Sequence, residues 1–299
     1  MFVLSMLALD LGVFNRKAQE VSVKKALWYS AFWISLALVF GVLVYFTRGS
    51  VDAVNFIAGY LIEESLSVDN LFVLLLIFSY FQIPAKYQHR VLFWGIIGAI
   101  VLRMAFIVAG IALIKIFYWV IYLFGAFLVY TGVGMAFHDE GAQVAPEKNP
   151  VLRAFRKLMP VTTGFEEGRF FVRKDGVKHA TPLFVTLLLV ETSDVMFATD
   201  SIPAIFAVTL DPFIVYTSNI FAILGLRSLY FALAGIMGMF HYLHYGLSVI
   251  LTILGIKMLA SGFFHIPVAA SLAFIAVTLG LSVAASVVFP RARDEDSGE

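Results

Sequence analysis

Apolar segments long enough to cross a lipid bilayer follow one another through most of this 299-residue sequence. A spanning helix needs roughly 20 mainly apolar residues. Segments of about this length lie at 27–46, 54–81, 91–114, 116–137, 182–210, 212–234, 243–260 and 266–289. With 61% apolar and only 14% charged residues, the chain has too little polar surface for a soluble globule of its size. These segments predict an all-α polytopic membrane protein.

Residues 1–14 are also apolar, but they contain Asp10 and are too short for a full span. A signal peptide is the competing interpretation. The basic residues follow this apolar run instead of preceding it, however, and there is no A-x-A cleavage site. We therefore expect the end of a first span whose beginning lies upstream, which brings the total to about eight or nine transmembrane helices.

Because each span crosses the membrane, successive connecting segments lie on alternating sides. The basic residues are distributed unequally between these two sides. Of the 21 Lys and Arg residues, 16 fall on one face, and only Arg48 and Lys115 fall on the other. By the positive-inside rule, the basic face is cytoplasmic. The C-terminus is then expected in the cytoplasm, and the first span, if it is real, starts outside.

Carboxylates interrupt two of the apolar segments, three in each. They are Glu63, Glu64 and Asp69 in 54–81, and Glu191, Asp194 and Asp200 in 182–210. An acid at bilayer depth is costly unless it is protonated, paired or bound to a cation, so intramembrane acids indicate function. Only Arg103, Arg227 and Lys257 supply basic charge within apolar segments. The excess of acids predicts that a divalent ion, protons or both occupy the site.

Three features of the first half recur in the second half in the same order. The segment 66–70, which ends in Asp69 and Asn70, aligns with 197–201, which ends in Asp200 and Ser201. An intramembrane arginine follows in each half, and a Gly-containing stretch (131–135 and 254–258) comes third. The recurrence predicts two units of three helices each.

These units lie at 54–137 and 182–260, and the charge count places their beginnings on opposite faces of the membrane. They would therefore be inverted repeats, an architecture of many secondary transporters, with the site near the midplane where the units meet. The remaining parts would be N-terminal spans (1–53), a cytoplasmic linker that is most simply a solvated connector (138–181), and a final span with a charged tail (261–299).

The polar residues of the two acidic segments offer oxygen ligands. Carboxylates are joined by Asn70, Ser67 and Ser201, the chain has no cysteine, and its histidines lie near the ends of predicted spans. Such a set favours Mn²⁺, Mg²⁺ or Ca²⁺ over Zn²⁺ or Cu⁺. Alternation between metal-loaded and protonated states would give cation/proton antiport, which stays a hypothesis here.

A straight helix could not direct all three acids of 182–210 to one side. Asp200 lies six residues beyond Asp194, roughly 120° further around the helix axis. Pro203 removes a backbone donor and clashes with the preceding turn. We expect a kink or unwinding around 198–201 that re-aims Asp200 and frees carbonyl oxygens.

Structural roles compete with functional ones for several of these residues. Arg103 and Arg227 could be counter-ions that tune the acids, or could take part in gating. Lys257 could snorkel or pair. The hydroxyl groups could bond to carbonyls of their own helices or serve as ligands; they belong to Ser65, Ser67, Thr192, Ser193 and Ser201.

Enzymatic alternatives find little support. A membrane aspartyl protease would have paired aspartates, but its GxGD pattern is absent. No P-loop, strand-associated GxGxxG or HExxH occurs either, which argues against an enzyme and against ATP-driven transport by this chain alone.

Segments 59–70, 190–204 and 217–227 resemble the TerC family of integral membrane proteins, most closely its Alx branch, and 170–174 and 180–183 fit as well. The resemblance extends over nearly the whole chain. Two features depart from it: the first span starts short, which leaves Asp10 in doubt, and Gly134 stands where the second unit has Lys257.

The family is similar to the LysE-type exporters, so the resemblance implies an inner-membrane exporter of Mn²⁺ that limits cytosolic manganese or supplies secreted metalloenzymes. A link to tellurite resistance is implied too. Ca²⁺ is the alternative ion. The ligand candidates carried over by motif are Glu63 or Glu64, Asp69, Asn70, Glu191, Asp194, Asp200 and Ser201.

We expect Ser67, Arg103, Arg227 and Lys257 to support this site by charge or gating. The expected partners are the bilayer, the metal ion and protons, with no nucleic acid, and the oligomeric state stays open. The second hypothesis is a membrane-embedded metal-binding or accessory scaffold that does not transport.

Overall fold

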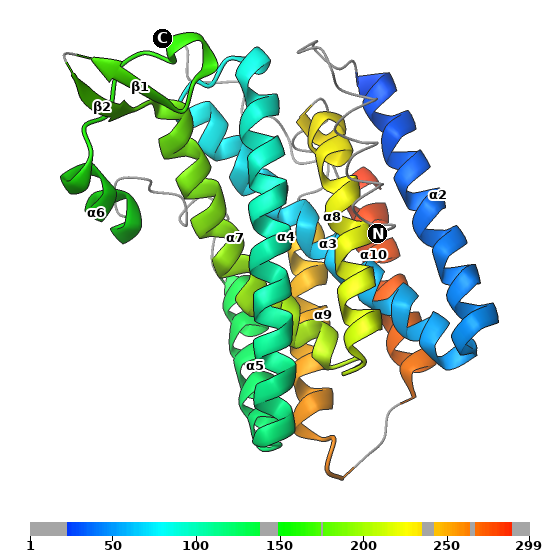
Figure 1. The fold of residues 1–299 in the computed structure, drawn as a ribbon. Helices are drawn as coiled ribbons and strands as arrows, with labels where there is room; N and C mark the ends of the chain where they lie inside the picture. The colour runs from blue at the N-terminus through cyan, green and yellow to red at the C-terminus, as the bar shows by residue number, and fades with distance from the viewer. Residues whose placement is uncertain (1–22, 138–148, 175, 235–241, 264–266, 289–299) are drawn as a thin grey trace.

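The computed structural model describes residues 23–137, 149–174, 176–234, 242–263 and 267–288. Long helices standing side by side dominate this part of the chain (Figure 1). They are α2 (Val23–Arg48), α3 (Ser50–Tyr80), α4 (Ala85–Ile116), α5 (Val120–Phe137), α7 (Pro182–Phe206), α8 (Pro212–Ala234), α9 (Leu243–Leu259) and α10 (Val268–Val288). The prediction of an all-α polytopic membrane protein is confirmed.

Six of these helices, α2, α4, α5, α7, α8 and α10, are long and apolar enough to cross a membrane. Helix α9 is apolar but shorter, and α3 carries the first three intramembrane acids. Each of the eight predicted spans corresponds to one helix, although α4 begins at Ala85 instead of 91 and α7 ends at Phe206 instead of 210. The predicted first span with Asp10 and the charged tail lie outside the described residues.

Helices α5 and α9 pack against each other in opposite directions. A Cβ atom added at Gly255 would lie 2.6 Å from the carbonyl oxygen of Gly125. Further along α5, the Ser248 hydroxyl, one turn into α9, donates a hydrogen bond to the carbonyl oxygen of Gly132 (2.6 Å). Glycine at these positions lets the two backbones approach closely, as is common between membrane helices.

The other two pairs of corresponding helices are antiparallel as well. Gly59, early in α3, lies beside Ile205 at the end of α7, whereas Ile77 near the end of α3 packs with Val185 at the start of α7. Helix α4 begins beside the end of α8 and ends beside its start, where Lys115 and Pro212 line one pocket. In each of the three pairs the two helices run in opposite directions, and the inverted repeat itself stays a prediction.

A kink or an unwinding of α7 was predicted, and the unwinding is wrong. The helix is continuous from Pro182 to Phe206, with Pro203 inside it. The turn around Pro203 is fully packed, since Ala198, Ile202 and Ile205 are all buried in the core. In a membrane bundle, neighbouring helices hold such a turn in place even where proline removes a donor.

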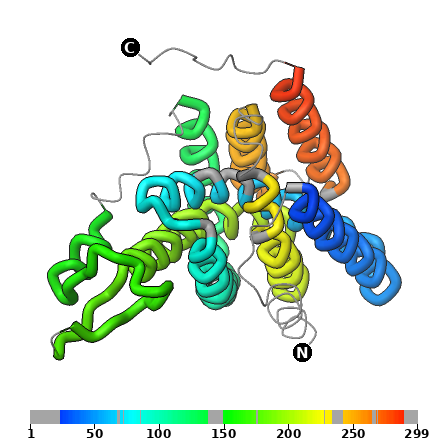
Figure 2. Tube along the Cα trace, turned by 90° about the horizontal axis from the view of Figure 1, so that it is seen from above, coloured from blue at the N-terminus to red at the C-terminus, as the bar shows by residue number. Residues whose placement is uncertain are grey.

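The linker, predicted as a solvated connector, contains regular secondary structure where the structure describes it. It contains α6 (Pro150–Leu158), a 3₁₀ turn (Glu166–Gly168) and an antiparallel hairpin of β1 (Phe171–Lys174) and β2 (Val177–Ala180). We call residues 149–180 the linker module. Figure 2 shows it at the opposite edge of the bundle from α2. The bundle end where α3 stops and α7 starts is named the linker end.

Candidate functional site

A buried charged network joins four helices near their middles. Arg103 of α4 forms ion pairs with Glu63 of α3 and with Asp194 of α7, the latter from Nη2 to Oδ1 at 3.2 Å. Arg103 Nη1 also donates to Asn219 Oδ1 on α8 (3.1 Å), and Asn219 Nδ2 donates to Glu63 Oε2 (3.1 Å). The side chains of Glu63 and Arg103 are 0% and 1% exposed. Charges this deep persist only when they are paired and hydrogen-bonded.

The two acids of this network come from corresponding positions of the predicted units. The offset that aligns 66–70 with 197–201 also aligns Glu63 with Asp194. Because α3 and α7 run in opposite directions, both acids approach the crossing of the two helices, and one guanidinium reaches both. The pairing leaves one more carboxylate than guanidinium in this network.

Several buried oxygen atoms beside these acids have no hydrogen-bond partner among the described residues. They belong to the hydroxyls of Ser67 and Ser201 and to one carboxylate oxygen each of Glu64 and Asp194. An unsatisfied buried hydroxyl costs about 1–3 kcal/mol. Ser65 and Thr192, by contrast, bond to carbonyls of their own helices. The hydroxyls of Ser65 and Thr192 therefore have the structural role of bonding to their own helices, whereas those of Ser67 and Ser201 do not.

The remaining acids are spread around the network. Glu64 points toward Gly225 of α8 and has a hydrogen-bond partner in Tyr60. Glu191 lies directly over Gly98 of α4, where a Cβ atom would overlap its carboxylate. Glycine at position 98 therefore makes room for Glu191 against α4, whereas a Cβ atom at Gly225 would meet Glu64 at ordinary contact distance.

Other predicted site residues lie elsewhere or are not described. Lys257 donates to Ser271 of α10 (2.9 Å), so the structure does not bring it to the acids. Asp200 is half-buried, whereas the side chains of Asp69 and Arg227 lie outside the described set. Within the described side chains, no group of three His, Cys, Asp or Glu residues is placed to hold a metal ion. Of the described acids, Glu63 and Asp194 meet at Arg103, whereas Glu64 and Glu191 lie against Gly225 and Gly98.

A pocket leads from the network toward the linker end. It is lined by Asp194, Ser193 and Asn70, and then by apolar residues such as Ile77 and Leu92 where α3 ends and α4 begins. The amide nitrogen of Asn70 is buried without a hydrogen-bond partner. Two predicted ligands, Asn70 and Asp194, thus share one cavity.

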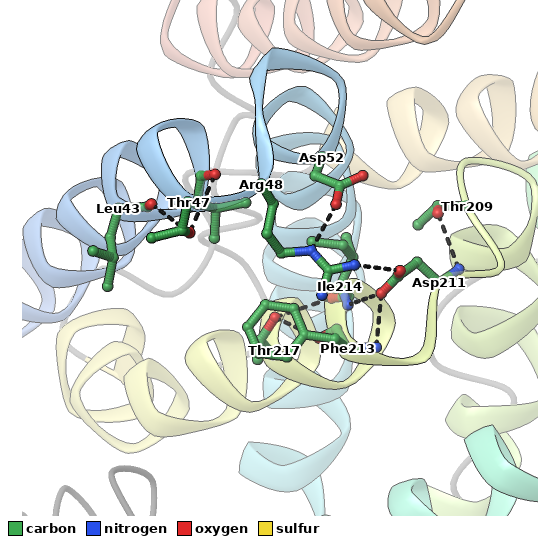
Figure 3. Close-up of polar contacts among 10 residues, drawn as sticks. Leu43, Thr47, Arg48, Asp52, Thr209, Asp211, Phe213, Ile214 and Thr217 are labelled. Carbon is green, nitrogen blue, oxygen red and sulfur yellow. Dashed lines mark hydrogen bonds and ion pairs between the residues drawn. The ribbon is translucent and has the colours of Figure 1, made fainter.

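At the opposite end of the bundle, helix ends are joined by a cluster around Arg48, which we name the Arg48 clamp (Figure 3). Arg48, the last residue of α2, bonds to Asp52 of α3 and to Asp211 before α8, each at 2.7 Å. Its guanidinium also lies 4.9 Å from the centre of the Phe213 ring. Asp211 caps α8 by accepting from the amides of Phe213 and Ile214. One arginine thereby ties three helix ends together.

Comparison with known proteins decides the family. The family described as "Integral membrane protein TerC family" matches residues 48–294. The chain belongs to the TerC family. This membership and the apolar helices make it an integral membrane protein. No solved structure matches the chain.

Relatives of this TerC protein cover nearly its whole length. A Myxococcus xanthus "uncharacterized membrane protein" is 54% identical over 97% of this chain and 91% of its own. The Escherichia coli K12 protein named "Putative membrane-bound redox modulator Alx" is 50% identical over 90% of this chain and 87% of its own. A Rickettsia bellii "uncharacterized membrane protein" is 42% identical over 96% and 94%.

Asn219 is a residue of this network in the TerC protein that was not predicted from the sequence. Asn219 is 1% exposed and bonds to both Arg103 and Glu63. Its signal was present: an amide in an otherwise apolar run, inside segment 217–227 that carries the family resemblance. A buried amide needs partners, and only charged or polar groups on neighbouring helices could supply them.

Proposed function

We propose that this TerC-family protein exports a divalent cation from the cytoplasm, with Mn²⁺ as the first candidate and Ca²⁺ as the alternative. The observation that carries the proposal is the pair Glu63 and Asp194, which is buried at mid-bundle and joined by Arg103. Unpartnered oxygens of Ser67 and Ser201 are hard donors of the kind these ions prefer. The antiparallel pairing of corresponding helices supports the inverted-repeat architecture of secondary transporters.

Arg103 would act as a resident counter-ion in this proposal. A guanidinium that neutralises Glu63 and Asp194 without substrate makes the empty site tolerable in the membrane. An arriving cation would compete with Arg103 for the same carboxylates, and Asp194, which lines the pocket, would be met first. Protonation of the remaining acids would supply the coupling in an antiport cycle.

The charge distribution supports the membrane orientation that export requires. The linker end carries the basic linker module, so the positive-inside rule favours a cytoplasmic location for it and for the C-terminus. The pocket beside Asp194 extends toward this end. At the other end, the Arg48 clamp ties helix ends together, and the pocket between α4 and α8 is lined by none of the residues that pair with Arg103. In a bacterial-type inner membrane, a cation would therefore enter this conformation from the cytoplasmic side.

The name of the Alx relatives suggests redox modulation as a second function. The present chain has no cysteine, so thiol chemistry of its own is excluded. Control of manganese would alter redox balance indirectly and would reconcile that name with cation export. The other competing role, a metal-binding or accessory scaffold linked to stress or tellurite resistance, requires no flux at all.

Transport by purified protein in liposomes tests the proposal. We expect Mn²⁺ flux that Asp194→Asn and Asp200→Asn reduce by at least tenfold, whereas Lys257→Gln, which lies away from the network, retains most of it. Mn²⁺, Ca²⁺ and Mg²⁺ are compared side by side, with and without a proton gradient. Absence of flux for every ion would reject the exporter and leave the scaffold, and flux that ignores the gradient would reject only antiport.

A further inference from the structure

The linker module is fixed to the bundle at the level where α7 begins. Leu152 of α6 is 2% exposed and packs with Val185 and Leu189 in the first turns of α7. The Phe184 ring contacts Phe155 of α6 and Phe171 of the hairpin, with centroids 5.3 and 4.4 Å apart. Because α7 is a membrane span that starts at Pro182, this packing holds α6 beside the bilayer surface.

The module carries a strong excess of positive charge. In sequence it has seven Lys and Arg residues and three acids, Glu166, Glu167 and Asp175. Glu166 pairs with Lys174, and Glu167 pairs with Arg169. The other basic side chains have no carboxylate partner in the described part of the chain; they are Arg153, Arg156, Lys157, Arg173 and Lys178. Arg169, Arg173 and Lys178 line one shallow pocket on the hairpin. Such a surface is complementary to phosphate groups.

Helix α6 has basic side chains on one face and exposed apolar side chains on the opposite face. Arg153, Arg156 and Lys157 follow i, i+3, i+4 spacing and share one face, whereas Val151 and Leu158 lie seven residues apart on the other. Val151 is 42% and Leu158 84% exposed. A short helix with basic residues on one face and exposed apolar residues on the other is typical of segments lying in a membrane interface.

We propose that the linker module binds the headgroups of anionic phospholipids in the leaflet beside α7. The basic face of α6 and the hairpin pocket would contact lipid phosphates, and Leu158 and Val151 would enter the boundary with the acyl chains. A soluble phosphate would satisfy the charges but not these apolar side chains. Because the surface is separate from the Arg103 network, the inference does not depend on the proposed transport.

Hydrogen exchange of the full chain in nanodiscs tests this inference. We expect amides of 150–180 to exchange about tenfold more slowly with phosphatidylglycerol than with phosphatidylcholine, because each basic residue near an anionic surface adds attraction. The triple variant Arg153→Gln, Arg156→Gln and Lys157→Gln should lose most of this difference. Lys24→Gln with Lys25→Gln, which removes exposed basic residues at the start of α2, should retain it.

Three outcomes would overturn the proposal. The first is equal exchange in both lipids, and the second is an equal loss of protection in the Lys24 and Lys25 control, which would indicate a general charge effect. The third is protection by inorganic phosphate in phosphatidylcholine nanodiscs that matches the phosphatidylglycerol effect, since the ligand would then be a soluble anion. Native mass spectrometry gives an independent test. Retention of phosphatidylglycerol by the wild type but not by the triple variant would support an anionic lipid as the ligand.

Discussion

At the scale of single residues, Arg103 determines which acids of the site are neutralised. It pairs with Glu63 and Asp194 and bonds to Asn219, so three other helices depend on one guanidinium. Removing one partner of a buried ion pair is costly because the remaining charge loses its compensation. Acids without an ion pair to a described residue, such as Glu64, should be less important for stability.

Substitution of neighbouring glutamates separates these two roles. We expect Glu63→Gln to destabilise the protein by about 3 kcal/mol, because Arg103 keeps only Asp194 as a charged partner. Glu64→Gln should cost much less, since it removes a carboxylate that is already partly unpartnered. Melting of both purified variants in detergent gives the comparison. Equal losses in melting temperature would show that the pairing with Arg103 does not govern stability.

A second prediction concerns the position of Glu191. In Gly98→Ala, the new methyl group would overlap the Glu191 carboxylate, so that side chain must move away from α4. If its present position serves transport, Mn²⁺ flux should fall several-fold while the protein still inserts. Gly134→Ala is the matched control, because a Cβ there has open space within 4 Å. Unchanged flux in Gly98→Ala would remove Glu191 from the transport site.

The sequence indicated which polar residues lie within the helical bundle, but not how they pair. The acids, Asn70 and the serines could be chosen because polar groups at bilayer depth are costly and few. Which acid meets Arg103 could not be predicted, because it depends on the rotation and crossing of α3, α4 and α7. Asn219 was missed for the same reason, since its partners Arg103 and Glu63 are distant in the sequence.

At the scale of helices and strands, the lengths of the apolar segments predicted the spans well. The continuity of α7 and the fold of the linker module were not predicted. The run of apolar residues sets where a helix can cross, and every described span was found near its predicted place. The unwinding of α7 was wrong because tertiary packing overrides the local effect of Pro203. The linker module was missed because its fold depends on contacts with Phe184 and Val185 of α7.

Two aspartates of the Arg48 clamp allow a test at this scale. Asp211 both pairs with Arg48 and caps α8, whereas Asp52 only contributes to the ion pairing (Figure 3). Loss of a helix cap costs about 1 kcal/mol, and exposed ion pairs contribute little. Asp211→Ala should therefore lower the melting temperature more than Asp52→Ala does. The reverse order would mean that the ion pair to α3, not the cap, stabilises this end.

At the scale of the whole molecule, the two ends of the bundle differ. A pocket lined by Asp194 reaches toward the linker end. At the other end, Arg48 ties α2, α3 and α8 together, and the pocket between α4 and α8 is not lined by Asp194 or its partner Arg103. This asymmetry is what an alternating-access transporter needs in one of its states, since the central site should be accessible from one side at a time. The same asymmetry predicts from which side a reagent can reach the site.

Labelling of single cysteines measures that access on a clean background, because the chain has none of its own. In oriented vesicles, we expect a membrane-impermeant maleimide to modify Ser193→Cys, which lines the pocket, from the linker end only. Lys24→Cys marks the linker end, and Phe263→Cys, 84% exposed after α9, marks the other. Mn²⁺ should slow labelling of Ser193→Cys but not of either marker. Modification from the Phe263 side at the same rate would mean that the Arg48 clamp does not close that end, and alternating access through this pocket would then be rejected.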